Sequence, residues 1–342
     1  MSIMTVRIGI NGFGRIGRSY LRAALASDAD VEVVAVNDLT DARTLATLLE
    51  WDSVSGHLDG VGVDGDTLTV GDKTIAVFAR PEPADIPWGD VGADVVIEST
   101  GHFTDGAAAA AHLQGGARKV VVSAPAKGDV PTFVLGVNDD QLDPDSHDVF
   151  SNGSCTTNSL APLAKVLHDS FGIESGLMTT VHAYTGDQRL HDAPHSDLRR
   201  ARAAAVSIIP TSSGAAKAIG KVLPELDGRL TGAALRVPVP VGSITDLTVV
   251  LRERADVDDV NAAFREAAAS ERLRRYLQYS EAPLVSADIV GNPHSSIFDA
   301  PLTQASGTQA SGTQVKVFGW YDNEWGFSHR LVEFSATIGA AL

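Results

Sequence analysis

A glycine-rich turn near the N-terminus constrains the fold of this chain more than any other feature. It follows an apolar run at residues 6–10, opens an amphipathic pattern at residues 15–25, and reads Gly12-Phe13-Gly14-Arg15-Ile16-Gly17. Such a turn between a strand and a helix lets the backbone approach a pyrophosphate, whose charge the helix N-terminus stabilises. A second predicted strand, residues 31–37, ends at Asp38, 21 residues after Gly17. This spacing is typical of a carboxylate that binds an adenosine ribose. The pattern predicts a dinucleotide-binding unit, and its alternative is a merely tight strand-to-helix turn.

Residues 38 and 39 indicate which dinucleotide would bind. The carboxylate of Asp38 would repel a 2′-phosphate, and Leu39 stands where an arginine would be needed to attract one. The sequence therefore favours NAD over NADP.

The first half of the chain alternates short strands with helices. Further strands are predicted at residues 94–98, 119–123 and 133–137, and further helices at 41–49 and 106–113. This alternation predicts a doubly wound α/β domain that extends to about residue 154. After it we expect helices at 156–171, 214–223, 257–277 and 324–342, and strands at 176–184, 235–251 and 315–321. The polar, arginine-rich stretch at 185–202 is predicted as a functional or intersubunit loop.

Composition and charge exclude several classes of protein. A length of 342 residues suggests about two domains, and a hydrophobic share of 44% is ample for a packed core. Acidic residues outnumber basic ones by 43 to 27, and the net charge of −16 argues against nucleic-acid or anionic-membrane partners. We expect no membrane-spanning helix and no secretion signal. Cys155 is the only cysteine, so no intramolecular disulfide forms and a cytoplasmic enzyme is the simplest interpretation.

That cysteine stands in a polar segment at the predicted start of a helix. Residues 151–158 read S-N-G-S-C-T-T-N. The N-terminal end of a helix favours thiolate over thiol, which is the form that a nucleophile needs. The alternative is a buried structural cysteine, and the polar flanks argue against it.

A nucleophilic cysteine needs a base, and His182 is a candidate. It lies near the end of the predicted strand at residues 176–184, 27 residues after Cys155. A helix followed by a returning strand would bring both side chains to one edge of the sheet. Spacing alone does not choose among the ten histidines, so an ordinary hydrogen-bonded histidine remains the alternative.

Several motifs, taken in order, resemble phosphorylating glyceraldehyde-3-phosphate dehydrogenase of type I. Besides the cysteine segment they are T-V-H-A-Y-T at 180–185, D-L-R-R-A-R at 197–202, I-P-T-S-S-G-A-A-K at 209–217 and W-Y-D-N-E-W-G at 320–326. The resemblance extends from Arg7 nearly to the C-terminus. It implies an NAD-binding Rossmann domain, residues 1–154, completed by the C-terminal helix 324–342. It also implies an α+β catalytic domain with a large mixed sheet, residues 155–323.

The resemblance also implies roles for individual residues. Cys155 would attack the aldehyde of glyceraldehyde 3-phosphate, His182 would accept the proton, and inorganic phosphate would attack the resulting thioester. The residues implied to bind the cofactor are Gly12, Gly14, Arg15, Ile16, Gly17, Asp38, Ser123 and Asn323. Those implied around the substrate phosphate are Thr185, Asp187 and Arg236, and those around the attacking phosphate are Ser154, Thr156, Ser213 and Gly214. A homotetramer is expected, and no metal site.

The chain departs from the family pattern at a few positions. Ser159 stands where many relatives have a second cysteine, Ser213 replaces a threonine, and Phe327 replaces a tyrosine. Arg80 is displaced by one place, so we assign it no cofactor contact. A tandem repeat at residues 303–314 reads T-Q-A-S-G-T-Q-A-S-G-T-Q and is interpreted as a lengthened surface turn.

Other functions remain open at this point. The first alternative is erythrose-4-phosphate dehydrogenase, which has nearly the same motifs but releases a free acid. An aspartate-semialdehyde-type dehydrogenase also pairs cysteine with histidine, although Arg236 and residues 211–214 fit it poorly. A non-catalytic binding protein that has kept the fold is the third.

Overall fold

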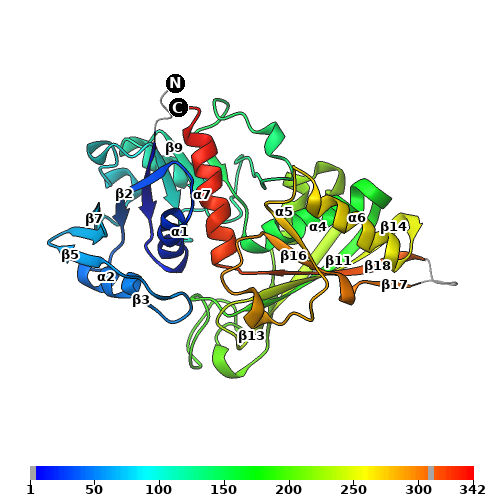
Figure 1. The fold of residues 1–342 in the computed structure, drawn as a ribbon. Helices are drawn as coiled ribbons and strands as arrows, with labels where there is room; N and C mark the ends of the chain where they lie inside the picture. The colour runs from blue at the N-terminus through cyan, green and yellow to red at the C-terminus, as the bar shows by residue number, and fades with distance from the viewer. Residues whose placement is uncertain (1–4, 307–311) are drawn as a thin grey trace. The chain divides into compact units, whose positions relative to one another are not determined.

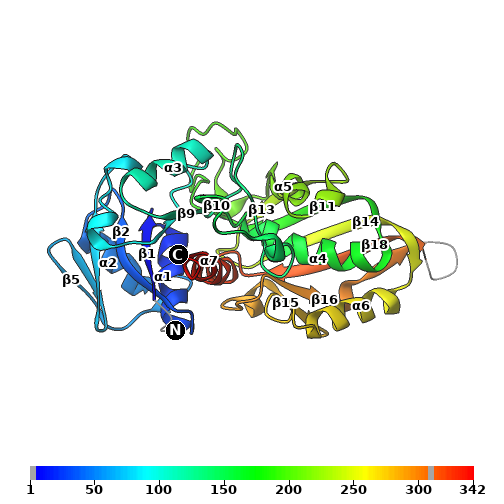
Figure 2. The same ribbon diagram turned by 90° about the horizontal axis from the view of Figure 1, so that it is seen from above.

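The computed structural model describes residues 5–306 and 312–342 (Figures 1 and 2). The chain divides into two compact units. Unit 1 comprises the chain up to residue 133 together with 141–153 and 328–342, and unit 2 comprises 134–140 and 154–327. Within the described ranges, no helix has the length and apolar character needed to cross a membrane.

Unit 1 is built on an eight-stranded sheet in the order β10-β9-β8-β1-β2-β7-β6-β5. The six strands from β10 to β7 run parallel, and β6 and β5 add an antiparallel hairpin at one edge. The strands are β1 (Val6–Asn11), β2 (Val31–Asn37), β5 (Val61–Asp64), β6 (Thr67–Val70), β7 (Lys73–Phe78), β8 (Val95–Glu98), β9 (Lys119–Val122) and β10 (Val149–Ser151). Its helices are α1 (Arg15–Ala26), α2 (Ala42–Glu50) and α3 (Gly106–Gln114), and β3 (Trp51–Asp52) pairs with β4 (Gly56–His57).

The strand order reverses between β1 and β8, and the glycine-rich turn follows β1 at this switch point. In open parallel sheets this is where ligands bind. Helix α7 (Trp325–Gly339) contributes its residues from Ser328 onward to unit 1, where Ser335 Oγ lies 2.7 Å from the hydroxyl of Tyr20. The predicted doubly wound architecture is confirmed.

A buried carboxylate ties the strand ends of unit 1 together. Glu98, at the end of β8, is 1% exposed and accepts hydrogen bonds from Asn11 Nδ2 at 2.6 Å and from the backbone N–H of Thr100 at 2.8 Å. Trp88 Nε1 donates to His112 Nδ1 at 3.0 Å, so the ring proton of neutral His112 is on Nε2, which lies 3.0 Å from Glu98 Oε2. The charge is therefore well satisfied without solvent.

Unit 2 is built on a mixed sheet in the order β12-β13-β11-β14-β18-β16-β15, with β17 paired to β18. The strands are β11 (Ile173–Ala183), β12 (Ile209–Ser212), β13 (Leu230–Val237), β14 (Ser243–Ala255), β15 (Leu277–Ser280), β16 (Ser296–Asp299), β17 (Gln304–Ser306) and β18 (Gly312–Tyr321). Helices α4 (Cys155–Phe171), α5 (Ala215–Val222) and α6 (Val257–Ala269) pack against this sheet (Figure 2). The mixed sheet of the second domain is as expected.

Strand alternation explains which face the helices cover. Met178 of β11, Leu247 of β14 and Val317 of β18 are buried in one core with Leu160 and Leu163 of α4. Away from the ends of β11, side chains of the opposite parity on the same strands are exposed or half-buried. The sheet thus has one face packed on helices within the unit.

Three predicted elements are wrong. Residues 133–137 form no strand, because Val134 N donates to Asn138 Oδ1 at 2.8 Å and Gly136 adopts a φ of 82° in a buried turn. A short apolar run does not distinguish such a turn from a strand.

The single strand predicted at residues 235–251 is two strands. Pro238 and Pro240 offer no N–H to a sheet ladder, and Gly242 has a φ of 92°. Strand β13 therefore ends at Val237, and β14 begins at Ser243 on the other side of β11.

The helix predicted at 257–277 ends at Ala269. Ser270 Oγ donates to Ala267 O at 2.6 Å and accepts from Leu273 N at 3.2 Å. A serine that bonds its neighbouring backbone in this way competes with helix propagation. The repeat at 303–314 falls partly on residues outside the described ranges.

Candidate active site

Cys155 is the first residue of α4. Ser154 caps the helix: its Oγ accepts a hydrogen bond from Thr157 N at 3.1 Å. The carbonyl of Ser154 is held by Asn158 Nδ2 at 3.0 Å. The polar segment that the sequence presents here therefore shapes the helix start, and it leaves the thiol beside the first backbone N–H groups of the helix.

His182 lies near the end of β11 and faces the thiol. Its side chain is on the same face of the strand as Met178 and Thr180, which are buried, and its exposed fraction is 3%. The distance from Cys155 Sγ to His182 Nε2 is 3.4 Å. The ring packs edge-on against Tyr321, with 5.9 Å between centroids. The structure thus brings together the candidate nucleophile and the histidine that the family resemblance implies as its base.

Burial keeps both groups of this pair neutral. Desolvation raises the pKa of the Cys155 thiol above its usual value, although the charge of Arg236 opposes this. Desolvation and the same guanidinium lower the pKa of His182 to about 3. Desolvation and the positive end of the helix therefore act on the thiol pKa in opposite directions. A neutral imidazole is the form that can accept a proton from the thiol.

Arg236 joins this pair through sheet register. It lies on β13 directly beside His182 of β11, and its Nη1 is 2.7 Å from His182 Nδ1 and 3.2 Å from Ala183 O. Its Nε is buried and has no hydrogen-bond partner among the described residues. A partly buried guanidinium with a donor to spare is suited to binding an anion.

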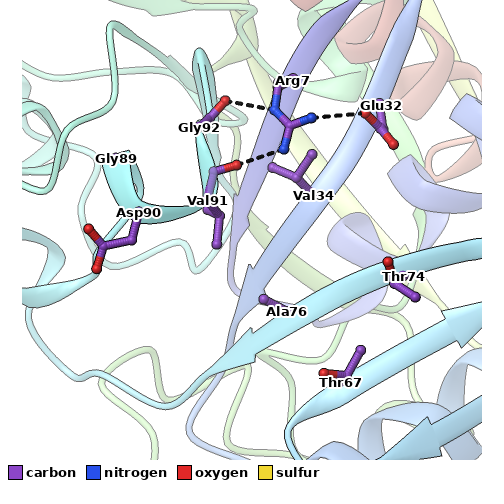
Figure 3. A pocket seen from close by; sticks show the side chains of 10 residues that line it. All are labelled: Arg7, Glu32, Val34, Thr67, Thr74, Ala76, Gly89, Asp90, Val91 and Gly92. Carbon is purple, nitrogen blue, oxygen red and sulfur yellow. Dashed lines mark hydrogen bonds and ion pairs between the residues drawn. The ribbon is translucent and has the colours of Figure 1, made fainter.

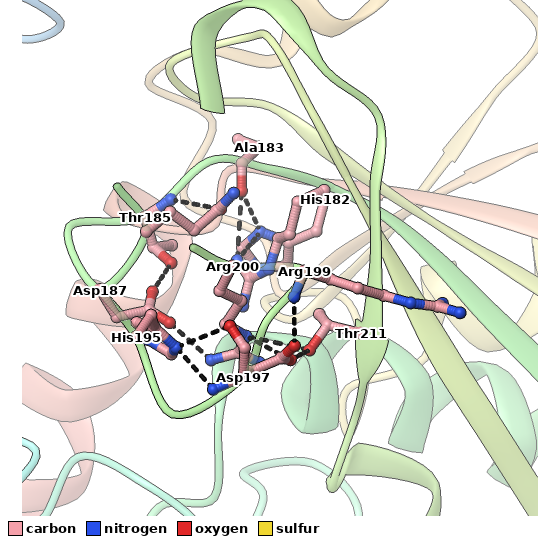
Figure 4. Close-up of polar contacts among 11 residues, drawn as sticks. His182, Ala183, Thr185, Asp187, His195, Asp197, Arg199, Arg200 and Thr211 are labelled. Atoms are coloured by element: carbon pink, nitrogen blue, oxygen red, sulfur yellow. Dashed lines mark hydrogen bonds and ion pairs between the residues drawn. The ribbon is translucent and has the colours of Figure 1, made fainter. Parts of the chain in front are cut away.

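The loop after β11 adds polar groups to the same site. Thr185 Oγ1 donates to Asp187, whose second oxygen accepts from Arg200 Nη1 at 2.5 Å. Arg200 Nε also donates to Thr211 Oγ1 at 2.9 Å. Figure 4 shows these side chains gathered with His182 in one cluster, while the side chain of Arg199 points away from it. Residues 184–203 contain neither helix nor strand.

The remaining residues implied in phosphate binding lie at two helix starts. Thr156, in the first turn of α4, has its Oγ1 2.8 Å from Tyr321 OH. Ser213 Oγ accepts from Ala215 N at 3.3 Å, and Gly214 is the N-cap of α5. No atom lies within 4 Å of the position that a Cβ on Gly214 would occupy, so the backbone there is open to a ligand.

Asn323 is held in one orientation. Its Oδ1 accepts from Gly242 N at 3.2 Å and from Ser243 Oγ at 2.9 Å. Its Nδ2 has no hydrogen-bond partner among the described residues and remains a donor, which suits the carbonyl of a carboxamide.

The glycines of the turn in unit 1 serve different purposes. A Cβ on Gly12 would lie 2.7 Å from Thr100 N, and one on Gly17 would lie 2.3 Å from Gly12 O, so both positions require glycine for packing. A Cβ on Gly14 would meet nothing within 4 Å. Two glycines thus close the turn and the third leaves the backbone exposed to a ligand, which is the arrangement that holds a pyrophosphate.

The other cofactor residues predicted in unit 1 lie at strand ends and at the start of α1. Asp38 follows β2, and its oxygens accept from Phe13 N at 2.9 Å and Thr40 N at 3.0 Å. Ser123 follows β9, and its N donates to Glu98 O at 3.0 Å. The guanidinium of Arg15 forms an ion pair with Asp52, so the group that Arg15 directs at the turn is its backbone. Ile16 occupies the first turn of α1.

Comparison with known proteins decides the family. Residues 6–106 match the description "Glyceraldehyde 3-phosphate dehydrogenase, NAD binding domain", and residues 154–323 match "Glyceraldehyde 3-phosphate dehydrogenase, C-terminal domain". The chain belongs to the glyceraldehyde-3-phosphate dehydrogenase family. It is 60% identical over 340 residues to glyceraldehyde-3-phosphate dehydrogenase 2 of Streptomyces arenae, covering 99% of this chain and all of that protein. It is likewise 60% identical to the glyceraldehyde-3-phosphate dehydrogenase of Mycobacterium tuberculosis strain H37Rv, with 99% and 100% coverage.

As a member of this family the protein is an NAD-dependent oxidoreductase. The open backbone at Gly14 and the carboxylate of Asp38 fit this cofactor, because one accommodates a pyrophosphate and the other a ribose diol. When bound, NAD supplies a hydride acceptor.

Sequence analysis did not predict two residues that the structure places near Cys155 and His182. Arg200 lies in the D-L-R-R-A-R motif and Tyr321 in the W-Y-D-N-E-W-G motif, but neither motif shows which side chain faces the cysteine. Tyr321 OH lies 2.8 Å from both Thr156 Oγ1 and Thr180 Oγ1, and burial raises its pKa. The two motifs indicated that functional residues lie in these segments. The position of Tyr321 beside Thr156 and Thr180 depends on the pairing of β18 with β14, which the motifs do not reveal.

A pocket in unit 1 is separate from the glycine-rich turn. It lies at the amino ends of β1 and β2, where Arg7 bonds the carbonyls of Val91 and Gly92 and pairs with Glu32 (Figure 3). The turn lies at the carboxyl end of β1, where ligands of such sheets bind. The donors of Arg7 that point at this pocket are already occupied, so it is not the cofactor site.

Proposed function

We propose that the protein catalyses the reversible, NAD-dependent phosphorylating oxidation of D-glyceraldehyde 3-phosphate to 1,3-bisphosphoglycerate. The observation that carries this proposal is the 3.4 Å contact between Cys155 Sγ and His182 Nε2, with the Arg236 guanidinium beside the same imidazole. A nucleophile, a base and an anion-binding group within one site match an aldehyde that bears a phosphate.

The chemistry of the pair follows from its protonation states. His182 Nε2 accepts the thiol proton while Cys155 Sγ bonds to the aldehyde carbon, and the proton passes to the carbonyl oxygen to complete a thiohemiacetal. His182 would then accept that hydroxyl proton, so that the carbonyl of a thioester can form, and NAD, when bound, would supply the hydride acceptor for this oxidation. An oxygen of inorganic phosphate attacks the thioester carbon, and Cys155 departs with the proton held by His182.

Two anion-binding regions support the phosphate steps. Arg236, Thr185 and Asp187 would surround the substrate phosphate, with Arg236 as the charged anchor. Ser154, Thr156, Ser213 and Gly214 would bind the attacking phosphate through hydroxyl and backbone donors. In a chain of net charge −16, fixed donors of this kind are needed because the surface field repels phosphates.

Cofactor binding would use the glycine-rich turn. Gly14, Arg15 and Ile16 would hold the pyrophosphate through backbone N–H groups at the start of α1, while Gly12 and Gly17 would shape the turn around it. Asp38 would accept from the adenosine ribose, Ser123 would lie near the cofactor, and Asn323 Nδ2 would donate to the nicotinamide carboxamide.

The active form would be a homotetramer in the cytoplasm. The loop after β11 carries Leu190 and Leu198, which are 73% and 81% exposed, and Val206 and Ile208 follow at 81% and 66%. Apolar side chains grouped on one segment at such exposure are typical of an interface. A second copy of this chain is the natural partner, because most soluble oligomers are symmetric homo-oligomers.

The experiment that tests this function measures NADH formation with two aldehydes. Glyceraldehyde 3-phosphate and erythrose 4-phosphate are each supplied with NAD, with and without inorganic phosphate or arsenate. We expect the triose to be oxidised rapidly only when phosphate or arsenate is present. If phosphate fails to accelerate turnover of the triose, or if the tetrose is oxidised faster to a free acid, the proposal is wrong and the alternative dehydrogenase takes its place.

A further inference from the structure

Four neighbouring strand ends of unit 1 share one buried hydrogen-bond network. Strands β8, β1, β2 and β7 are adjacent and parallel, so their carboxyl ends lie at the same edge of the sheet as the glycine-rich turn. The network contains Glu98 from β8, Asn11 from β1, Asn37 from β2 and the backbone of Arg80, just after β7. The exposed fractions of the three side chains are 1%, 2% and 4%. The network thus lies at the edge where the cofactor is expected to bind.

The backbone of Arg80 fixes the orientation of both asparagine amides. Arg80 N donates to Asn37 Oδ1 at 2.8 Å, and Asn37 Nδ2 donates to Arg80 O at 2.9 Å. The same Nδ2 donates to Asn11 Oδ1 at 2.8 Å. A backbone N–H cannot accept and a backbone carbonyl cannot donate, so neither amide can turn over without losing these bonds. Asn11 is therefore fixed as a donor towards Glu98, with its Nδ2 at 2.6 Å from Glu98 Oε2.

Glu98 is the acceptor at which the branches of the network end. The indole of Trp88 fixes the tautomer of His112, whose Nε2–H points at Glu98 Oε2. The other oxygen, Oε1, accepts from the backbone N–H and the hydroxyl of Thr100. Four donors therefore meet one carboxylate, which accepts with both oxygens and donates with neither. An amide in its place would point an N–H at a donor, whichever way it lay.

The bond from Thr100 N to Glu98 fixes a loop that packs on the glycine-rich turn. Ser99 Oγ lies 2.8 Å from Gly12 O, to which it donates, and a Cβ on Gly12 would lie 2.7 Å from Thr100 N. No space for even a methyl group separates the loop from the turn at this point. From the other side, Gly12 N donates to Asn37 O at 2.8 Å. Residues of the network thus hold the turn from both neighbouring strands, and a shift of Thr100 would displace it.

We propose that Glu98 is a positioning residue for the dinucleotide. Its carboxylate holds the loop at Thr100 against the glycine-rich turn and, through Asn11 and Asn37, fixes the backbone at Arg80. The affinity for the dinucleotide then depends on a charge that is buried in the protein and closed off from the ligand. The inference rests on the cofactor site of the proposed function and on no step of the aldehyde chemistry.

The test measures the dissociation constant of NADH by fluorescence titration, without aldehyde, for wild-type protein and for Glu98→Gln. The amide keeps the size of the side chain but leaves at least one donor of the network without an acceptor. We expect the affinity for NADH to fall by about tenfold, because a buried donor that loses its acceptor moves the loop or the network.

Lys119→Met is the matched control. Lys119 is 6% exposed, and its Nζ donates to Pro144 O and His147 O, both at 2.7 Å, at the amino end of β9. The substitution removes a buried, hydrogen-bonded charge from the same sheet, but at the edge opposite to the glycine-rich turn. We expect this variant to lose stability in urea and to bind NADH as wild-type protein does.

Exchanging the carboxylate and the amide separates positioning from general destabilisation. In the double variant Asn11→Asp with Glu98→Gln, the carboxylate at position 11 can accept from Asn37 Nδ2 and from the amide at position 98. It can also accept from His112 Nε2, which lies 3.4 Å from Asn11 Nδ2 in the present structure. The amide oxygen at position 98 can still accept from Thr100 N. Every donor again has an acceptor and the net charge is unchanged, so we expect each single variant to bind NADH weakly and the double variant to recover most of the affinity.

Several outcomes would overturn the proposal. One is a folded Glu98→Gln that binds NADH as tightly as wild-type protein. Equal weakening in Lys119→Met, or no recovery in the double variant, would assign the effect to general destabilisation. If Glu98→Gln does not fold, hydrogen exchange in nucleotide-free wild-type protein gives the answer: Thr100 N–H should exchange slowly, and fast exchange would contradict the proposal. Wild-type protein that binds no NADH would instead refute the proposed cofactor site, so the two failures are distinguishable.

Discussion

At the scale of single residues, the site depends on burial as much as on proximity. The sequence predicted Cys155 and His182 as a pair, and the structure places them 3.4 Å apart. The sequence could not predict how their pKa values shift, because these depend on desolvation and on Arg236. Arg236 is 54 residues away from His182 in the chain. Register between β11 and β13, which no local pattern reveals, makes that contact.

The depressed pKa of His182 predicts how stability depends on pH. In the unfolded chain its pKa is about 6.5, and in the folded chain it is about 3. Well above pH 6.5 neither state is protonated, so the residue has no effect. As pH falls below 6.5 the unfolded chain gains a proton that the folded chain resists, and the folded state loses stability. At pH 5 this loss should be about 2 kcal/mol.

His182→Asn removes this contribution. We expect the free energy of unfolding, measured in urea, to fall less for the variant than for wild type between pH 7.5 and pH 5. Other titrating groups, including His329 whose pKa is lowered to about 4, are present in both proteins and cancel in the difference. Equal losses in the two proteins would show that His182 is not buried as a neutral group.

At the scale of elements, periodicity and capping predicted most of the fold. The boundaries of β2 and the start of α1 agree with the sequence patterns, because alternation and a glycine-rich turn are local signals. The elements that were predicted wrongly depend on tertiary context or on single residues. Residues 133–137 are buried without a strand partner, and the prolines at 238 and 240 separate β13 from β14.

The start of α4 offers a test at this scale. Ser154→Ala removes the oxygen that accepts from Thr157 N, so the first turn of the helix loses its cap. We expect the free energy of unfolding in urea to fall by about 1 kcal/mol. Ser154→Thr keeps a capping hydroxyl and is the matched control. If the alanine and threonine variants are equally stable, the cap contributes nothing to the stability of the fold.

At the scale of the whole molecule, the surface combines strong negative charge with an apolar loop. The net charge of −16 keeps copies of the chain apart unless a specific contact overcomes it. The helices cover one face of the unit 2 sheet, while Leu177 of β11 on the other face is 65% exposed. The sequence predicted a contact loop at 185–202 but not which of its side chains are exposed.

Leu198→Asp tests the expected assembly. A carboxylate on a side chain that is 81% exposed should cost the isolated chain little, but it should oppose burial in an interface. We expect wild-type protein to sediment as a tetramer and the variant to dissociate. Val63→Asp, on the edge strand β5, changes a 40% exposed side chain in unit 1 and should leave the tetramer intact. Sedimentation of wild-type protein as a monomer would refute the assembly.

The most direct measurement of the central claim is the mass of the chain during the reaction. Enzyme mixed with NAD and glyceraldehyde 3-phosphate, without inorganic phosphate, is quenched in acid and digested. The account predicts an acyl group on the peptide that contains Cys155, and its disappearance when phosphate is added before the quench. NADH formed with no acyl group on Cys155, or an acyl group that phosphate does not remove, would contradict it.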